Sequence, residues 1–341
     1  MENKRYLILE DGTVMQGTGF GAQGDVTGEL VFNTSMVGYM ETLTDPSYFG
    51  QIVVQTFPSI GNYGVMLSDV ESEVPALQGY IVREWCQEPS NFRCEGVLDT
   101  FLQEKNVVGL SGIDTRALTR KLRRSGTMNA MITDDPTVTE ARLQQIADFR
   151  VTEAVAAVSP KERTQITSLD ADKKVVLWNF GARAQLARNL VQYGCEVTVM
   201  PATATAEQIL AEKPDGIVLS DGPGDPAENT AIVAEVKKLM EADLPMLGIC
   251  LGHQLLALAA GAQTAKLPYG HRGSNQPAVY TETGHAYITA QNHGFTVVGI
   301  PSRAAARSAL STPTTVPARV STTQAARSAR CSLCRMPSVV N

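Results

Sequence analysis

The stretch Gly248-Ile249-Cys250-Leu251-Gly252 decides the fold of the second half of this chain. An apolar run, 244–247, comes directly before it, and a helical pattern, 253–258, follows it. This order predicts a strand, a sharp turn and a helix, with the Cys250 thiol at the turn. Glycine is expected on both sides because a Cβ would clash in a strained, crowded turn.

The predicted turn places Cys250 at a helix N-terminus, where free backbone N–H groups and the helix dipole favour thiolate over thiol. The pattern is the cysteine counterpart of the Gly-x-Ser-x-Gly nucleophile elbow. A buried, inert cysteine at a strand end is the alternative interpretation. The flanking glycines and the strand–helix context favour the nucleophile.

Strands alternate with helices through the segment 173–298. Strands are expected at 175–179, 196–200, 216–220 and 246–249, and helices at 184–193, 206–212 and up to 240. Such alternation predicts an α/β domain with a mostly parallel sheet covered by helices. Ligands bind at the carboxyl ends of the strands of such sheets, so the Gly222-Pro223-Gly224 loop and Cys250 are expected to converge.

The other parts of the chain have different patterns. Closely spaced glycines and short strands predict a β-rich α+β domain over residues 1–150, with a helix at 115–125. The weak pattern of residues 151–172 predicts a linker. Residues 300–341 contain no Asp, Glu or Lys, so the segment 299–341 is expected to be a disordered tail that leaves the second domain incomplete.

The bulk composition is that of a globular protein. The chain has 341 residues, of which 43% are hydrophobic and 19% charged, and its net charge of −6 argues against a nucleic acid partner. The N-terminal residues are not expected to form a signal peptide, and no apolar run is long enough to span a bilayer. We therefore expect a cytoplasmic protein. Cys331 and Cys334 have metal-ligand spacing without a second pair nearby, so no metal site is expected.

The motifs of both parts resemble known families. Residues 173–298 resemble a class I glutamine amidotransferase domain, and residues 1–150 resemble the amino-terminal domain of the carbamoyl-phosphate synthase small subunit. The amidotransferase motifs are Ser220-Asp221-Gly222-Pro223-Gly224-Asp225-Pro226, 248–254 and Gln291-Asn292-His293-Gly294-Phe295. The amino-terminal motifs are Val31-Phe32-Asn33-Thr34-Ser35-Met36, Thr44-Asp45-Pro46-Ser47-Tyr48 and Gly112-Ile113-Asp114-Thr115-Arg116.

The resemblance implies a reaction and a partner. Glutamine is hydrolysed through a Cys250 thioester, and the ammonia passes to a large subunit that makes carbamoyl phosphate for arginine and pyrimidine synthesis. The two subunits form a heterodimer, the large subunit uses ATP and Mg, and this chain binds no cofactor itself.

The resemblance also implies a set of site residues. Residues that hold the glutamine would be Ser47, Gly222, Gly224, Leu251, Gln254, Asn292, Gly294 and Phe295. Because Ser47 comes from the first domain, the site would lie between the domains. The backbone N–H of Leu251 and one N–H of the 222–224 loop are the expected oxyanion donors.

The sequence departs from the family at the catalytic base. Family members have a downstream His-Pro-Glu, in which the histidine is the base and the glutamate orients it. None of the four histidines, His253, His271, His285 and His293, precedes Pro-Glu, and a structural role is expected for all four. Re-reading plausible codons of 312–320 in another frame gives a family-like sequence, so we hypothesise a frameshift near Gly299.

Three functions remain open from the sequence. The first is the glutaminase subunit of carbamoyl-phosphate synthase, with activity impaired in the chain as written. The second is a glutaminase component of another synthetase, which the motif 44–48 argues against. The third is a catalytically dead binding subunit, which the absent His-Pro-Glu favours.

Overall fold

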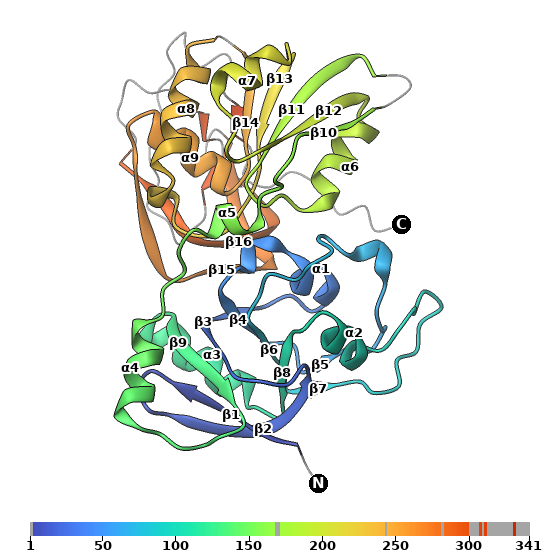
Figure 1. Ribbon diagram of the computed structural model, residues 1–341, viewed down its shortest axis with the longest axis vertical. Helices are drawn as coiled ribbons and strands as arrows, with labels where there is room; N and C mark the ends of the chain where they lie inside the picture. The colour runs from blue at the N-terminus through green and yellow to red at the C-terminus, as the bar shows by residue number, and fades with distance from the viewer. Residues whose placement is uncertain are drawn as a thin grey trace. The chain divides into compact units, whose positions relative to one another are not determined.

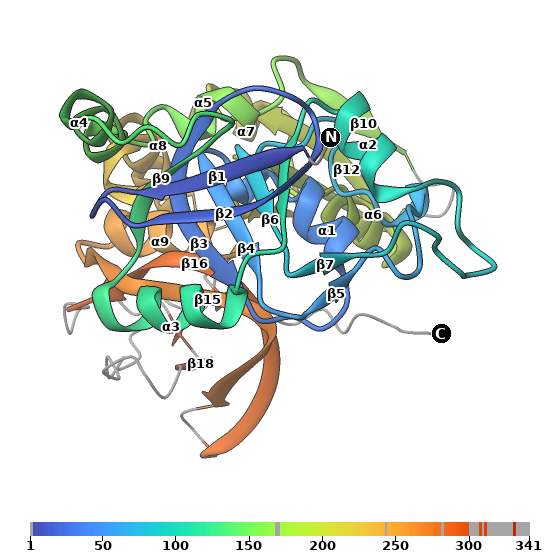
Figure 2. The same ribbon diagram turned by 90° about the horizontal axis from the view of Figure 1, so that it is seen from below.

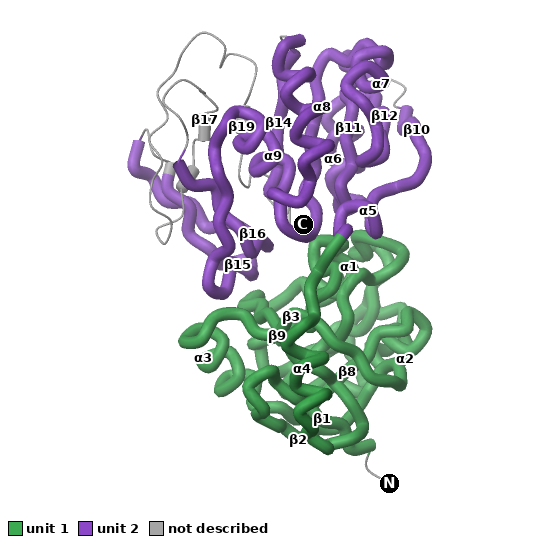
Figure 3. The backbone as a smooth tube through the Cα atoms, turned by 60° about the vertical axis from the view of Figure 1, so that its left-hand side comes forward, with its two compact units in different colours: residues 1–152 green, residues 153–341 purple. Residues whose placement is uncertain are grey.

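The computed structural model describes residues 3–167, 171–242, 244–280 and 283–299, together with three two-residue strands at 307–308, 310–311 and 330–331. The chain forms two compact units, residues 1–152 and 153–341 (Figure 3). Among the residues described, no helix is long and apolar enough to cross a membrane.

The first unit is built on a closed β-barrel (Figure 2). Its strands in spatial order are β1 (Lys4–Leu9), β2 (Val14–Gly21), β8 (Val108–Ser111), β6 (Gly79–Ile81), β4 (Gln51–Gln55), β3 (Val26–Asn33) and β9 (Met128–Thr133). Antiparallel pairing of β1 with both β2 and β9 closes the barrel. The prediction of a β-rich first part is confirmed. The sequence analysis did not predict that the strands close into a barrel, which depends on these long-range pairings.

Short helices and strands complete this unit. They are α1 (Tyr39–Thr44), η1 (Pro46–Tyr48), β5 (Ser59–Ile60), η2 (Leu67–Asp69), β7 (Glu84–Trp85), α2 (Leu98–Glu104), α3 (Thr115–Ser125) and α4 (Glu140–Asp148). Helix α3 has the bounds expected from the sequence, because Asp114 caps its first turn through the Ala117 N–H and Gly126 ends it. A buried cluster that includes Tyr39, Tyr80 and Phe101 joins α1 and α2 to the strands.

The second unit contains the predicted α/β sheet (Figure 1). Its strand order is β10 (Thr164–Ile166), β12 (Cys195–Pro201), β11 (Lys173–Asn179), β13 (Gly216–Leu219) and β14 (Met246–Gly248). The last four strands are parallel, and β10 is an antiparallel edge. The mostly parallel sheet expected from the sequence is thus confirmed.

Helices cover both faces of this sheet because alternate strand residues point to opposite sides. On one face Val176 and Trp178 pack with residues of α7 (Ala206–Ala211), α8 (Thr230–Met240) and α9 (Leu251–Ala259). On the other face Leu177 and Val197 pack with residues of α6 (Ala184–Gln192). A short η3 (Pro226–Glu228) lies between β13 and α8.

Two long antiparallel strands follow α9. They are β15 (Gln263–Tyr280) and β16 (His285–Val298), and their pairing register shifts twice, between Lys266 and His271 and between Gly273 and Gln276. The short strands β17 (Arg307–Ser308), β18 (Leu310–Ser311) and β19 (Arg330–Cys331) come later in the chain. The prediction of a disordered tail over 299–341 otherwise falls on residues outside the described part.

The segment 151–172, expected as a linker, contains α5 (Ala154–Val158) and β10 within the second unit. Ala154 and Val155 are buried, and Val155 belongs to the same apolar cluster as Trp178. The sequence pattern is weak there because α5 is five residues long, so it shows little more than one helical turn of periodicity.

Candidate active site

Cys250 lies at the turn between β14 and α9, where it is the N-cap residue of the helix. Its backbone has φ 48° and ψ −106°, a conformation that a residue with a Cβ rarely adopts. The thiol is half-buried and forms no disulfide. The strand, sharp turn and helix predicted from the sequence are present, and the strained backbone is the feature that distinguishes a nucleophile elbow.

The two flanking glycines are required by close packing of the elbow. A Cβ on Gly248 would lie 2.7 Å from the backbone of Gly252. A Cβ on Gly252 would lie 2.3 Å from the carbonyl oxygen of Leu219. Both distances are too short for real contacts, so any larger residue would push the helix away from the sheet.

The loop after β13 reaches the elbow, as the sequence predicted. The Gly252 N–H donates to the Ser220 carbonyl at 3.0 Å. A Cβ on Gly222 would lie 2.9 Å from the Leu251 Cδ2 atom, so the loop and the first turn of α9 are in direct contact. Neither the Gly222 N–H nor the Leu251 N–H donates to any acceptor in the part of the chain that the structure describes. Two backbone donors beside a thiol are therefore open to a ligand.

Strand β16 completes one side of the site. The Cys250 Sγ lies 3.5 Å from the Asn292 carbonyl oxygen. The Gln254 side-chain amide donates to the Phe295 carbonyl at 2.8 Å. Gly294 lies between these two contacts on the same strand. The structure thus brings Cys250, Gln254 and the segment 292–295 together.

Two histidines near this strand are buried and electrically neutral around pH 7. Burial lowers the pKa of His253 to about 4 and that of His293 to about 4. The His293 Nδ1 faces the Phe295 carbonyl oxygen at 2.8 Å. The His293 Nε2 faces both His271 Nδ1 at 3.2 Å and the Gln291 Oε1 atom at 3.1 Å. These contacts are structural, in line with the role expected from the sequence.

Ser47 belongs to the first unit. Its backbone N–H donates to the Asp45 carboxylate at 2.8 Å, which caps η1. Its predicted contribution to a glutamine site between the domains stays a prediction.

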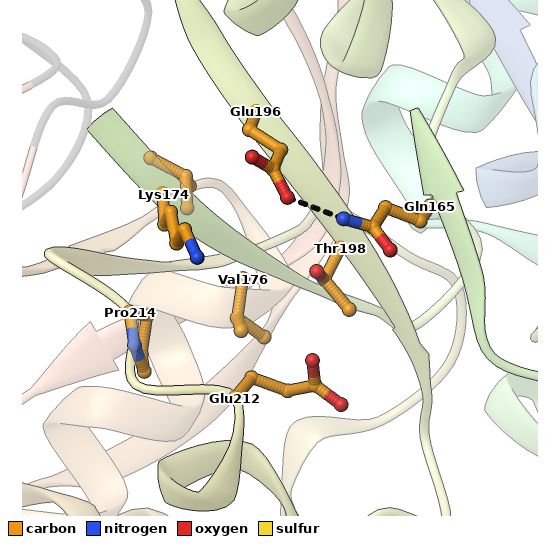
Figure 4. Close-up of a pocket in the computed structure, with 8 residues that line it drawn as sticks. Gln165, Lys174, Val176, Glu196, Thr198, Glu212 and Pro214 are labelled. Carbon is orange, nitrogen blue, oxygen red and sulfur yellow. Dashed lines mark hydrogen bonds between the residues drawn. The ribbon is translucent and has the colours of Figure 1, made fainter. Parts of the chain in front are cut away.

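The second unit also has a pocket away from the elbow. It is lined by polar side chains that include Lys174, Thr198, Glu196 and Glu212 (Figure 4). These residues lie toward the amino ends of β11 and β12 and next to the loop before β13, whereas Cys250 follows the carboxyl end of β14. The pocket is therefore separate from the elbow. No group of three or more His, Cys, Asp or Glu suited to a metal ion occurs among the described residues.

Comparison with known proteins follows the same division of the chain. The family model described as "Carbamoyl-phosphate synthase small chain, CPSase domain" matches residues 7–132, and "Glutamine amidotransferase class-I" matches residues 176–325. The carbamoyl phosphate synthase small chain of Clostridium perfringens (strain 13 / Type A) is 48% identical over 298 residues, 87% of this chain and 84% of that protein. The chain belongs to the carbamoyl phosphate synthase small-chain family.

Further relatives agree with this assignment. The carbamoyl phosphate synthase small chain of Symbiobacterium thermophilum is 48% identical over 85% of this chain and 81% of the relative. That of Bacillus thuringiensis subsp. konkukian is 48% identical over 86% of this chain and 80% of the relative. The family is therefore that of a synthase small chain with a glutamine amidotransferase domain, as the motifs indicated.

Sequence reasoning missed the residues that hold these groups in place. Ser220 is fully buried and makes hydrogen bonds to three segments, although a serine before Asp-Gly is typical of an ordinary turn. The His271–His293 pair was missed because the two residues are 22 positions apart on different strands. No short-range pattern reports either arrangement.

Proposed function

We propose that this chain is the glutamine-hydrolysing subunit of a carbamoyl phosphate synthase, with Cys250 as the nucleophile. The observation that carries the proposal is the elbow itself: a strained Cys250 at the start of α9, with the Gly222 and Leu251 N–H groups open beside it.

The chemistry follows from these groups. The Cys250 thiolate adds to the side-chain amide carbon of glutamine, and the carbonyl electron pair moves to oxygen. The C–N bond then breaks, nitrogen takes a proton and leaves as ammonia, and water hydrolyses the thioester to glutamate. The Gly222 and Leu251 N–H groups stabilise the oxyanion, and loss of one such donor costs about 3 kcal/mol of barrier.

The remaining predicted residues hold the substrate. Gln254 and the segment 292–295 lie within reach of Cys250 through the contacts described above. Gly224, with φ 87°, lets the backbone of the 222–224 loop approach the substrate closely. In this proposal Ser47 contributes from the first domain.

The partner is a large subunit that receives the ammonia and uses ATP, Mg and bicarbonate to form carbamoyl phosphate for arginine and pyrimidine synthesis. This chain then binds no cofactor of its own, forms a heterodimer with the large subunit and works in the cytoplasm. Support comes from the family to which the chain belongs.

Turnover by the chain as written is proposed to be low. No histidine of the sequence precedes Pro-Glu, and His253 and His293 have their pKa values lowered to about 4 by burial. Loss of a triad base costs several powers of ten in rate. Re-reading the coding DNA from the Gln291 codon onward tests the frameshift hypothesis, which fails if no other frame contains His-Pro-Glu.

The test is ammonia release from glutamine with and without the large subunit, in the parent chain and in Cys250→Ser, with Cys195→Ser as the matched control. The proposal expects a slow release that Cys250→Ser abolishes and Cys195→Ser leaves unchanged. The absent His-Pro-Glu favours one other function, a binding subunit without catalysis. If the chain is such a binding subunit, it is expected to capture the large subunit without any ammonia release that depends on Cys250.

A further inference from the structure

Ser220 takes part in four hydrogen bonds near the elbow. It is fully buried, and its hydroxyl accepts the Phe180 N–H at 2.8 Å and donates to the Asp221 carbonyl oxygen at 2.7 Å. Its own N–H donates to the Trp178 carbonyl at 3.1 Å, and its carbonyl accepts the Gly252 N–H at 3.0 Å. One residue thus joins β11, the loop after β13 and the first turn of α9.

The bond to the Asp221 carbonyl fixes the orientation of one peptide group. That carbonyl and the Gly222 N–H belong to the same peptide plane, and none of the described peptide bonds is cis. In a trans peptide the C=O and N–H bonds point in opposite directions. Holding the Asp221 oxygen toward Ser220 therefore turns the Gly222 N–H away from Ser220.

The Gly222 N–H has no acceptor among the described residues, and a Cβ on Gly222 would lie 2.9 Å from the Leu251 Cδ2 atom. A second hydrogen bond holds the Asp221 side chain, since Arg183 Nε donates to its carboxylate at 2.9 Å. The peptide before Gly222 is thus restrained at its carbonyl and at the neighbouring side chain, while its N–H stays open.

We propose that Ser220 is a positioning residue whose hydroxyl orients the Gly222 N–H as an oxyanion donor for the Cys250 reaction. The inference rests on the proposed function. It adds a residue that touches neither substrate nor thiol and acts through the Asp221–Gly222 peptide. Preorganised donors of this kind act mainly on the tetrahedral state and little on the bound ground state.

The probe that separates these states is L-glutamate γ-semialdehyde, the aldehyde analogue of glutamine. The Cys250 thiolate adds to its carbonyl carbon, and the C=O electron pair moves to oxygen, which gives a tetrahedral oxyanion. The adduct is tetrahedral and has no leaving group, so it forms without the absent His-Pro-Glu. Its dissociation constant is compared with that of glutamine by calorimetry.

The variants are Ser220→Ala and Ser220→Cys, with Ser159→Ala as the control. Ser159 is also buried and bridges two segments, accepting from the Ala202 N–H at 2.8 Å and donating to the Asn179 carbonyl at 2.8 Å. It makes no described contact with the peptide before Gly222. Ser220→Cys keeps a weak donor, so it covers the case in which Ser220→Ala does not fold.

Ser220→Ala is expected to weaken aldehyde binding at least tenfold, while its glutamine binding changes less than threefold. The aldehyde affinity of Ser220→Cys is expected to lie between those of Ser220→Ala and the parent. Ser159→Ala is expected to change the dissociation constants of the two ligands by the same factor. If the Ser220 variants bind both ligands equally more weakly, or bind neither more weakly, the inference about Ser220 is overturned and the proposed function is not. A parent chain that binds neither ligand would overturn the proposed function together with the inference.

Discussion

The side-chain amide of Gln254 donates to the backbone carbonyl of Phe295 at 2.8 Å, although the two residues are 41 positions apart in the sequence. Gln254 belongs to the first turns of α9, and Phe295 belongs to β16. The Phe295 carbonyl oxygen also faces His293 Nδ1. These two contacts hold the strand that lies against the Cys250 thiol.

Gln254→Ala removes this link between α9 and β16. Loss of this partly buried hydrogen bond is expected to lower the free energy of unfolding by about 1 kcal/mol. It is also expected to weaken glutamine binding at least tenfold, because the segment 292–295 is no longer held beside Cys250. Urea unfolding and calorimetry measure the two effects. Gln263→Ala, at an exposed glutamine of β15, is the control, and equal behaviour of the two variants would contradict this role.

Gly252→Ala is expected to disrupt the second unit. The added Cβ would lie 2.3 Å from the Leu219 carbonyl oxygen, so α9 has to move off the sheet. The expected loss is more than about 3 kcal/mol in the free energy of unfolding, or no folding of this unit. Gly216→Ala, whose Cβ would meet its nearest atom at 3.4 Å in the same sheet, should cost less. Comparable stability of Gly252→Ala and the parent would contradict the close packing of the elbow.

The stability of the folded chain is expected to fall as pH drops from about 6.5 to 4, in part through His253. Burial lowers the folded-state pKa of His253 to about 4, so between these pH values the unfolded chain binds a proton that the folded chain does not. The stability that the neutral His253 contributes is fully present above pH 6.5. Below that pH, the proton bound by His253 in the unfolded chain lowers the free energy of unfolding by about 1.4 kcal/mol per pH unit.

Urea unfolding of the parent and His253→Gln across this range measures that contribution. The slope of unfolding free energy against pH should be smaller in His253→Gln, whereas His285→Gln, at an exposed histidine, should keep the parent slope. A parent-like slope in His253→Gln would contradict the assignment of a buried neutral imidazole.

The sequence predicted the parts of this fold that local patterns specify. The elbow at Cys250 was predictable because glycines, an apolar run and a helical period occur within about ten residues. The convergence of Gly222 with Leu251 was predictable because carboxyl ends of neighbouring parallel strands meet. Closure of the barrel through β1 and β9 was not predictable, since the pairing of Leu7 with Ile132 spans most of the first unit.

The contacts that position the site were also beyond local pattern. The bond between Gln254 and Phe295 depends on how β16 packs against α9, and the four bonds of Ser220 depend on three separate segments. Short-range spacing reports which residues can react. It does not report which distant residues hold them in place.

Alkylation of the chain by the chloroketone analogue of L-glutamine tests the central claim most directly. The Cys250 sulfur forms a bond to the chloromethyl carbon and chloride leaves, so the reaction needs a nucleophile in a glutamine site and no further base. Intact mass and peptide mapping identify the modified residue. The account predicts one label, on Cys250, with glutamine protecting against it. Equal labelling of Cys195 and Cys250, or labelling of Cys250 that glutamine does not slow, would contradict it.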